Sequence, residues 1–329
     1  MRSSMRFDRR ITWRLTALLV LLISAALLVS GCQTSAEKQE EAKSAGIQAM
    51  NKGDYKKAVE MFDEALKSSE GTVSGDEIDI CLYKAAAQYN MDDIKGAIKT
   101  YTALLEYDDK DSDPYFLRGS VYLKSGEKTA GIDDYKEAIK RDEKNYDLYI
   151  AIYENLKKMN FEKEGEEFLN IALEKSGDSA EDSLGRGRIY TLLKQYDAAE
   201  TAFEKAYDKG QEDAKIYLAD MYLAEGKENE CDKILDELKD KDNLSSLACN
   251  AIASMELKRG NPEEALVYVN MGLDKFSVKN KRELLKNRVA AYEYMGQFNE
   301  AFTCAMEFLQ QYPQDVDMAR EVSFLSTRV

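Results

Sequence analysis

The sequence predicts an all-α protein, an α-solenoid of about eight helix pairs that ends in a C-terminal capping helix. Two observations lead to this fold class. The chain has only three prolines in 329 residues and is rich in alanine, glutamate, lysine, leucine and tyrosine, a composition typical of helical proteins. Small and aromatic residues also recur together at intervals near 34 residues, and repetition on this scale indicates stacked structural repeats.

The chain begins with a basic segment followed by an apolar one. Five arginines stand among the first 14 residues, and no charge occurs over residues 15–29. This apolar run is shorter than the about 20 residues that a membrane-spanning helix needs. A basic start, a short apolar middle and small residues at its end are typical of a secretory signal peptide. We therefore expect residues 1–31 to be removed and the mature chain to lie outside the cytoplasm.

The apolar run ends at Val29-Ser30-Gly31-Cys32, which resembles the lipobox of bacterial lipoproteins. The resemblance implies that Cys32 receives acyl chains such as palmitate and becomes the first residue. Two or more acyl chains would anchor the protein stably in the cell membrane. Gln33 follows, a residue that permits passage to the outer membrane in an organism that has one. The alternative is an ordinary secretion signal with an incidental cysteine.

The charge of the chain limits its partners. The net charge is −15, and removal of a leader with five arginines and one aspartate takes it to −19. This balance argues against nucleic acid, whose binding depends on lysine and arginine at the phosphates. It favours basic protein partners. The chain also has no histidine, the commonest general base and the commonest metal ligand.

Two stretches carry the repeating pattern most clearly. Gly119 is followed by Tyr122 and Gly126, and Gly187 stands 68 residues after Gly119, twice 34. Across the eight repeats, this first small position is occupied by Gly46, Ala85, Gly119, Tyr153, Gly187, Ala219, Ala253 and Val289. A second small position reads Ala58, Ala97, Gly131, Gly165, Ala199, Cys231, Ala265 and Ala301. The turn between them holds Gly53, Gly126, Gly226, Gly260 and Gly296, or instead Asp92, Asn160 and Lys194.

This pattern resembles the tetratricopeptide repeat, and the repeats around Gly119 and Gly187 match it best. The resemblance implies helix–turn–helix units stacked into a right-handed superhelix, with the first helices along a concave groove. Small residues allow two helices to approach to about 8–10 Å, and glycine adopts the left-handed turn that other residues resist. We therefore expect a lipidated cysteine and short tether over 32–38, a repeat array over 39–315 and a capping helix over 316–329.

Four cysteines remain after Cys32, namely Cys81, Cys231, Cys249 and Cys304. Cys231 occupies a small crossing position of the repeat, so the pattern favours small buried thiols at these places. The even count in an exported chain permits a second interpretation, a disulfide between Cys231 and Cys249.

In this family, ligand contacts come largely from the second, fifth, ninth and twelfth places of the first helix. The fifth places of five successive repeats are large and apolar: Leu82, Phe116, Ile150, Leu184 and Ile216. A contiguous exposed apolar stripe usually marks a binding site. We therefore expect these residues to bind protein or peptide segments. The alternative is that tight closure of the superhelix buries them within the array.

An acidic series runs beside the apolar one. The second places read Asp79, Asp113, Asp147, Glu181 and Asp213. The simpler interpretation is that acids in the first turn favour the helix dipole by about 0.3–1 kcal/mol. The second interpretation is ligand selection, and it adds Asp113, Asp147 and Glu181 to the expected protein-binding residues.

Motifs for catalysis or metal binding are weak. Asp109-x-Asp111-x-Asp113 resembles the start of a calcium loop, but that loop needs glycine sixth and glutamate twelfth, where this chain has Pro114 and Ser120. Without histidine, no serine or cysteine nucleophile has a plausible base. We expect no cofactor, no bound metal and no enzymatic activity.

Together these features predict a lipid-anchored, extracytoplasmic adaptor that binds protein or peptide segments in its concave groove. One alternative is an envelope assembly factor, of pilus or secretion type, that acts through its convex face. A less favoured alternative is a carboxylate hydrolase, which would need a pair of acids in a shared concave pocket.

Overall fold

The computed structural model describes residues 34–69, 73–175, 177–240, 243–275, 277–278, 280–312 and 316–329. Over these residues the chain forms seventeen helices and no strand, so the predicted all-α class is confirmed. The predicted signal peptide and Cys32 lie outside the described residues. In the described part of the chain, no helix is both long enough and apolar enough to cross a membrane.

The helices form eight consecutive pairs and a final single helix. The first helices of the pairs are α2 (Ser35–Asn51), α4 (Gly75–Asn90), α6 (Asp113–Lys124), α8 (Tyr146–Lys158), α10 (Ala180–Leu192), α12 (Ala214–Glu225), α14 (Ser246–Arg259) and α16 (Lys281–Tyr294). The second helices are α3 (Tyr55–Ser68), α5 (Ile94–Tyr107), α7 (Lys128–Arg141), α9 (Glu162–Leu173), α11 (Tyr196–Asp208), α13 (Glu228–Lys239), α15 (Pro262–Leu273) and α17 (Phe298–Gln311). Helix α18 (Val316–Leu325) follows the eighth pair.

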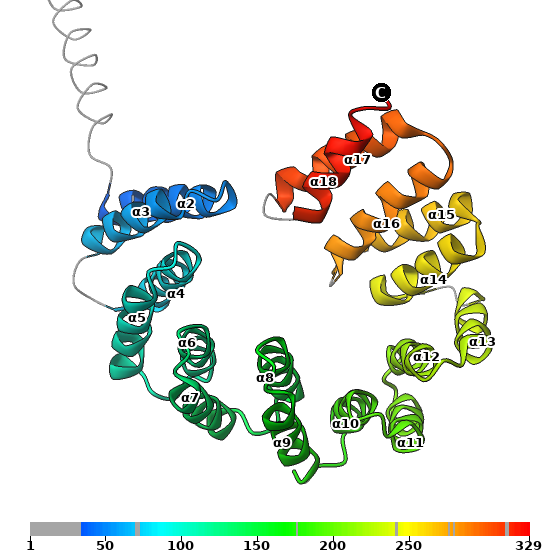
Figure 1. Cartoon of the computed structure of the whole chain (residues 1–329), viewed down its shortest axis with the longest axis horizontal. Helices are drawn as coiled ribbons and strands as arrows, with labels where there is room; N and C mark the ends of the chain where they lie inside the picture. Colours follow the sequence, from blue (N-terminus) through cyan, green and yellow to red (C-terminus); the bar gives the residue numbers. More distant parts are fainter. Residues whose placement is uncertain are drawn as a thin grey trace, which may run out of the picture.

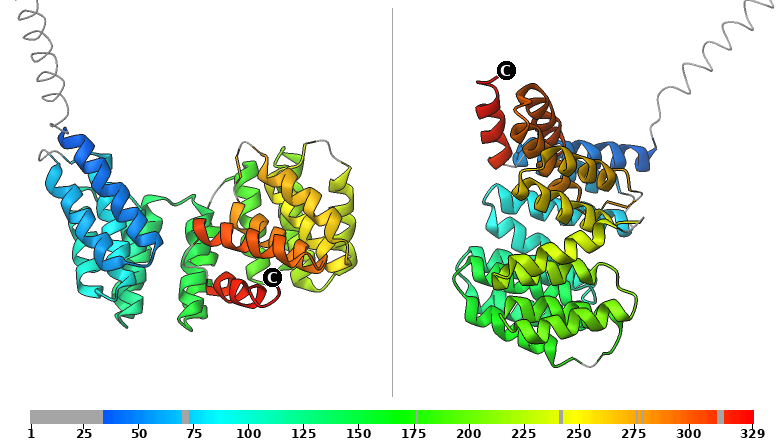
Figure 2. Two further views of the ribbon diagram at one scale, coloured as in Figure 1. Left: turned by 90° about the horizontal axis from the view of Figure 1, so that it is seen from above. Right: turned by 90° about the vertical axis from the view of Figure 1, so that its right-hand side faces the viewer.

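The pairs stack into an open arc (Figure 1). From α4 to α14 the first helices lie along the inner side of the arc, and their partners α5 to α13 lie along the outer side. The first and last pairs face each other across the mouth of the arc, as the turned views also show (Figure 2). This is the α-solenoid that the sequence predicts, and it makes the inner side a surface built mainly from first helices.

The turns within the pairs have one geometry in spite of their different residues. The predicted turn glycines all have φ between 72° and 86°, and the three residues that replace glycine, Asp92, Asn160 and Lys194, have φ of 66°, 61° and 58°. After Gly126, the N–H of Glu127 donates to the Tyr122 carbonyl at 2.8 Å, and this bond back to the end of the first helix closes the turn. The left-handed conformation of the turn therefore depends on its position in the repeat and not on the presence of glycine.

The small positions lie at helix crossings, as predicted. All eight members of the second small series are buried. A Cβ atom added to Gly187 of α10 would stand 2.5 Å from the ring of Phe203 in α11. A Cβ atom on Gly119 of α6 would stand 2.8 Å from the ring of Tyr135 in α7. Aromatic rings thus occupy the space that the glycines leave, and larger residues would force the helices apart.

Large buried side chains join one pair to the next. Tyr135 of α7, Tyr149 of α8 and Phe168 of α9 belong to one core cluster that spans the third and fourth pairs. At the C-terminal end, Leu325 of α18 is fully buried in the cluster that contains Phe308 of α17. Neighbouring pairs therefore cover each other's apolar faces, and α18 covers the last one, as a capping helix does.

The four cysteines of the described chain are free thiols. Cys231 and Cys249 are buried, which agrees with the predicted small buried residues. Cys231 faces a cavity beside α12, whereas the Cβ atom of Cys249 lies beside Gly272 of α15. Burial raises the pKa of both thiols, so neither is activated as a nucleophile.

Candidate functional site

The predicted apolar stripe follows the inner helices. Leu82, Phe116, Ile150 and Leu184 lie on α4, α6, α8 and α10 and are half-buried, whereas Ile216 on α12 is only 6% exposed. Four successive inner helices therefore carry a partly accessible apolar side chain at the same register. Ile216 has little surface to offer a ligand. The binding role of all five residues stays a prediction.

These side chains also pack inside the array. The ring of Phe116 stacks on the ring of Tyr135, with 5.6 Å between the centroids. Leu82 packs against the cluster that contains Tyr101, and Leu184 packs against the cluster that contains Phe203. Each residue thus combines a structural contact with a partly exposed face, so substitutions there must be checked for folding.

The predicted acidic residues beside the apolar stripe are exposed, but not all of them are free to contact a ligand. Asp147 of α8 forms an ion pair with Arg188 of α10, and Asp113 is exposed in the first turn of α6. Partial burial and the neighbouring Asp111 raise the pKa of the Asp113 carboxyl. Glu181 is exposed in the first turn of α10. Of the three predicted acids, one is thus already engaged between pairs.

Polar side chains bridge several junctions between pairs on the inner helices. Asn155 of α8 donates to the Ser120 hydroxyl of α6 at 3.1 Å. Asn287 of α16 donates to the Ser254 hydroxyl of α14 at 2.9 Å. Arg188 of α10, besides its ion pair with α8, lies over a tyrosine ring of α12. In each case a donor from the later pair reaches back to the earlier one.

The junction between the sixth and seventh pairs is different, because it contains a cavity of about 470 Å³ between α12, α13 and α14. Ile216, Leu235 and Met255 give the cavity an apolar floor. Asp220 of α12 and Lys258 of α14 also line it. The sequence analysis missed this cavity. A possible signal was Asp220 itself, which stands at the ninth place of its repeat, one of the places where the family contacts ligands.

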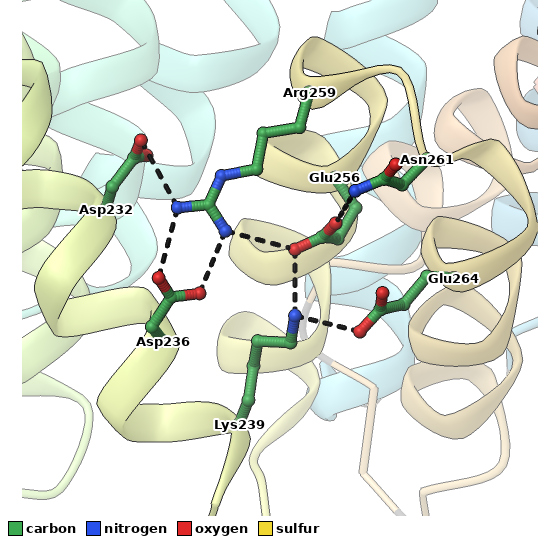
Figure 3. Close-up of polar contacts among 7 residues, drawn as sticks. All are labelled: Asp232, Asp236, Lys239, Glu256, Arg259, Asn261 and Glu264. Carbon is green, nitrogen blue, oxygen red and sulfur yellow. Dashed lines mark hydrogen bonds and ion pairs between the residues drawn. The ribbon is translucent and has the colours of Figure 1, made fainter.

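A network of charged side chains lies at one wall of this cavity and joins α13, α14 and α15 (Figure 3). Its centre is Glu256 of α14, which is only 1% exposed. The Glu256 carboxylate accepts hydrogen bonds from Lys239 of α13 at 2.9 Å and from Asn261 at 2.8 Å. Lys239 also pairs with Glu264 of α15 at 2.8 Å. One lysine thus ties three helices together.

Arg259 extends the network toward the cavity. Its guanidinium donates to both carboxylate oxygens of Asp236 at 2.8 and 3.1 Å and lies 3.3 Å from Asp232 (Figure 3). It also donates to Glu256 at 3.3 Å. Burial disfavours the charged form of Glu256, but the hydrogen bonds from Asn261 and Lys239 outweigh it and hold the pKa of its carboxyl below the usual value. Glu256 is therefore an ionised structural anchor.

The described residues contain no cluster of three or more His, Cys, Asp or Glu side chains that could hold a metal ion. The carboxylates of the network are committed to lysine, arginine and asparagine partners. The cavity thus combines buried apolar residues with charged residues at its rim.

Comparison with known families finds a match over three segments of the chain. The family described as "Tetratricopeptide repeat" matches residues 49–72, 112–145 and 184–208. The second and third of these segments contain Gly119 and Gly187. No family with a catalytic function was found among the matches. A search of curated proteins finds no match to this chain.

Several solved structures are similar to this chain. A tetratricopeptide repeat protein from Parabacteroides merdae is 18% identical, with 76% of this chain and 98% of that chain covered and a TM-score of 0.41. Yeast Tom70 is 12% identical, with 88% of both chains covered and a TM-score of 0.39. PilW, a type IV pilus biogenesis factor, is 15% identical, with 64% of this chain and 98% of that chain covered and a TM-score of 0.40. The assignment of repeats rests on the family match and on the helix pairs themselves.

Proposed function

We propose that this protein is a lipid-anchored adaptor, exposed outside the cytoplasm, that holds segments of other proteins along the inner side of its arc. The observation that supports this function is the row of half-buried apolar side chains at one register on α4, α6, α8 and α10, beside exposed carboxylates. Such a row is complementary to a segment with an apolar face and basic residues at its edge. The net charge of −15 favours the same kind of partner.

The anchor is the second part of the proposal, and its support is the sequence. Cys32 follows a leader with the shape of a signal peptide. Only Gln33 and Thr34 separate it from the start of α2, so an anchored array would stay close to the bilayer. In source cells fed an alkyne analogue of palmitate, the full chain should take up the label and sediment with membranes. The Cys32→Ser variant should lose both properties, and a labelled variant would contradict the anchor.

An affinity capture from the envelope of the source cell tests the inner surface. The inner variant is Leu184→Asp on α10. The matched variant, called the outer variant, is Val267→Asp on α15, a second helix of its pair like the outer helices α5 to α13, and its side chain is 57% exposed. We expect the wild type and the outer variant to retain the same partner and the inner variant to lose it. If thermal melting shows that Leu184→Asp is unfolded, Leu223→Asp replaces it, since Leu223 is an exposed side chain on the inner helix α12.

A second candidate function is an assembly factor that acts through the outer face. The observation that favours it is an exposed apolar pair, Val267 and Met271, one turn apart on the outer helix α15. Exposed apolar patches often mark contact sites. Under this alternative, Val267→Asp loses the partner while the inner variants retain it, so the same experiment separates the two functions.

A further inference from the structure

The first two pairs, α2 to α5, lie together at one end of the arc (Figure 1). Only Gln33 and Thr34 stand between Cys32 and Ser35, the first residue of α2. A chain extends by at most about 3.6 Å per residue, so the Cα atoms of Cys32 and Ser35 can be no more than about 11 Å apart. The surface beside Ser35 is therefore the part of the array that an acylated Cys32 would hold against the bilayer.

Two contacts show which residues lie beside the start of α2. The Ser35 hydroxyl donates to the carbonyl of Ser68, the last residue of α3. Val73 follows Ser68 by five residues and stands just before α4. The hydroxyl of Tyr107, the last residue of α5, donates to the Val73 carbonyl at 3.2 Å. The ends of α3 and α5 and the start of α4 thus meet at the same edge as the N-terminus of α2.

This edge exposes two large side chains that suit a lipid surface. Val73 is 48% exposed and Tyr107 is 57% exposed. The sequence around Val73, residues 71–75, reads Gly-Thr-Val-Ser-Gly and carries no charge. Tyrosine is enriched where membranes meet water, because its ring is apolar and its hydroxyl is polar. The composition of the edge therefore matches the headgroup region of a bilayer.

We infer that the edge formed by Val73 and Tyr107, the contact edge, lies on the lipid surface and sets the orientation of the arc on the membrane. The inference rests on the proposed function in one respect, the acyl anchor at Cys32. The anchor keeps the contact edge at a high local concentration beside the bilayer, so a small apolar surface is enough to hold it there. The same short tether favours lipid over a partner protein, because it leaves little room between this edge and the headgroups.

The distribution of charge limits the contact to the first two pairs. Near the contact edge, Asp76 is paired with Lys43 of α2 at 3.2 Å, and Glu37 belongs to the capping box of α2. Farther along the arc, residues 108–111 carry three acids and one lysine, and residues 142–144 carry two acids and one lysine. Such an excess of acid is repelled by anionic headgroups. The later pairs therefore tilt away from the bilayer, which leaves the inner side of the arc open to partners.

The chain permits a direct test, because its single tryptophan, Trp13, lies in the predicted leader. The acylated protein is purified from source cells in detergent and reconstituted into phosphatidylcholine vesicles, with or without lipids brominated near the headgroup. The variant Tyr107→Trp places the only tryptophan of the mature chain at the contact edge. Its fluorescence should be about twofold or more weaker in the brominated vesicles. Val73→Trp should behave in the same way and keeps the test valid if Tyr107→Trp melts below the wild type.

Tyr294→Trp is the matched control, since Tyr294 is 68% exposed and is the last residue of α16, beside a turn within a pair. Lys144→Trp tests the tilt, because Lys144 is exposed between α7 and α8, at the junction of two later pairs. Both variants should fluoresce equally in the two kinds of vesicle. Three results would overturn the inference: no quenching of either contact-edge variant, equal quenching of Tyr107→Trp and Tyr294→Trp, or equal quenching of Tyr107→Trp and Lys144→Trp.

This inference and the proposed function can fail in distinguishable ways. If the wild-type chain takes up no palmitate analogue and does not sediment with the vesicles, the anchor fails and the inference falls with it. If the chain sediments and Leu184→Asp loses the partner while neither contact-edge variant is quenched, the adaptor function stands and the lipid contact fails. If both contact-edge variants are quenched while Leu184→Asp and Leu223→Asp still capture the partner, the lipid contact stands and the inner groove fails.

Discussion

The junction between the third and fourth pairs and the junction between the sixth and seventh pairs share one backbone plan and are packed with different side chains. In the first, Asn155 donates to Ser120 across the inner helices. In the second, Met255 and Asp220 stand at the corresponding places, and a cavity lies beside them. The comparison teaches that the repeat pattern fixes the helix positions, while the side chains between successive pairs decide how each junction is packed.

The two junctions also differ in how they are held together. Tyr135, Tyr149 and Phe168 fill the closed junction with one continuous buried cluster. The open junction instead has the charged network around Glu256 at its wall (Figure 3). A cavity reduces the stabilisation that close packing gives. The charge pairs that tie α13 to α14 and α15 can offset part of this loss.

The largest expected effect comes from the centre of that network. Glu256→Ala removes the carboxylate that Lys239, Arg259 and Asn261 share, and we expect a loss of about 2–3 kcal/mol in the local stability of α13 and α14. Hydrogen exchange of these two helices measures it.

Glu264→Gln is the matched control for the network, because Glu264 is exposed and contacts only one of its members, Lys239. It should cost less than about 1 kcal/mol. Equal exchange of α13 and α14 in Glu256→Ala and in the wild type would mean that the open junction does not depend on the network.

The next effect tests close packing within a regular pair. Gly187→Ala places a Cβ atom against the Phe203 ring, and we expect a loss of about 1–3 kcal/mol by overpacking, measured by urea unfolding. Gly75→Ala is the control, since no atom lies within 4 Å of the added Cβ. If both variants unfold at the same urea concentration, the small residues at the crossings are not required by packing.

A smaller effect comes from closing the open junction. Ala251→Asn puts a donor at the place that Asn287 occupies in the next pair, where it can bond Asp220. We expect up to about 1 kcal/mol of added stability in thermal unfolding. A variant that gains no stability would mean that no hydrogen bond forms across this junction.

The smallest effect concerns the capping helix and pH. Partial burial, and then a hydrogen bond with the Glu321 carboxyl of α18, raise the pKa of Glu293 in α16 to about 7, against an opposing effect of Arg328. Because the folded-state pKa lies above the unfolded value of 4.5, this stabilisation is complete below about pH 4.5 and is lost as the pH rises through about 7.

The matching variant is Glu293→Gln, which keeps a hydrogen bond and removes the titration. Since both carboxyls are partly solvated, we expect it to stabilise the docking of α18 at pH 8 by less than about 1 kcal/mol and to have little effect at pH 5. Hydrogen exchange of α18 at the two pH values measures the difference. A variant that loosens α18 equally at both values would contradict the titration of this pair.

Much of the fold could be predicted from the sequence because it depends on local, repeated requirements. The crossings need small residues, so Gly119 and Gly187 mark them. The turns need a residue in the left-handed backbone conformation. The spacing of the repeat predicts that Asn160 and Lys194 occupy this position although they are not glycine. These features depend on spacing alone, and spacing is visible in the chain.

Less of the candidate site could be predicted from the sequence. The register of the apolar stripe was correct, but the burial of Ile216 depends on how closely α12 packs against its neighbours. The cavity is lined by residues of three helices, and two of them, Asp220 and Met255, are 35 residues apart. The pattern of one repeat does not show how closely side chains of different repeats pack.

The central claim is that partner segments lie on the inner side of the arc. The most direct measurement is photocrosslinking in source cells, with a photoreactive amino acid at Leu223 on the inner helix α12 or at Val267 on the outer helix α15. The account predicts a crosslinked partner from position 223 and none from position 267. A partner crosslinked from position 267 alone would contradict it and move the binding surface to the outer face.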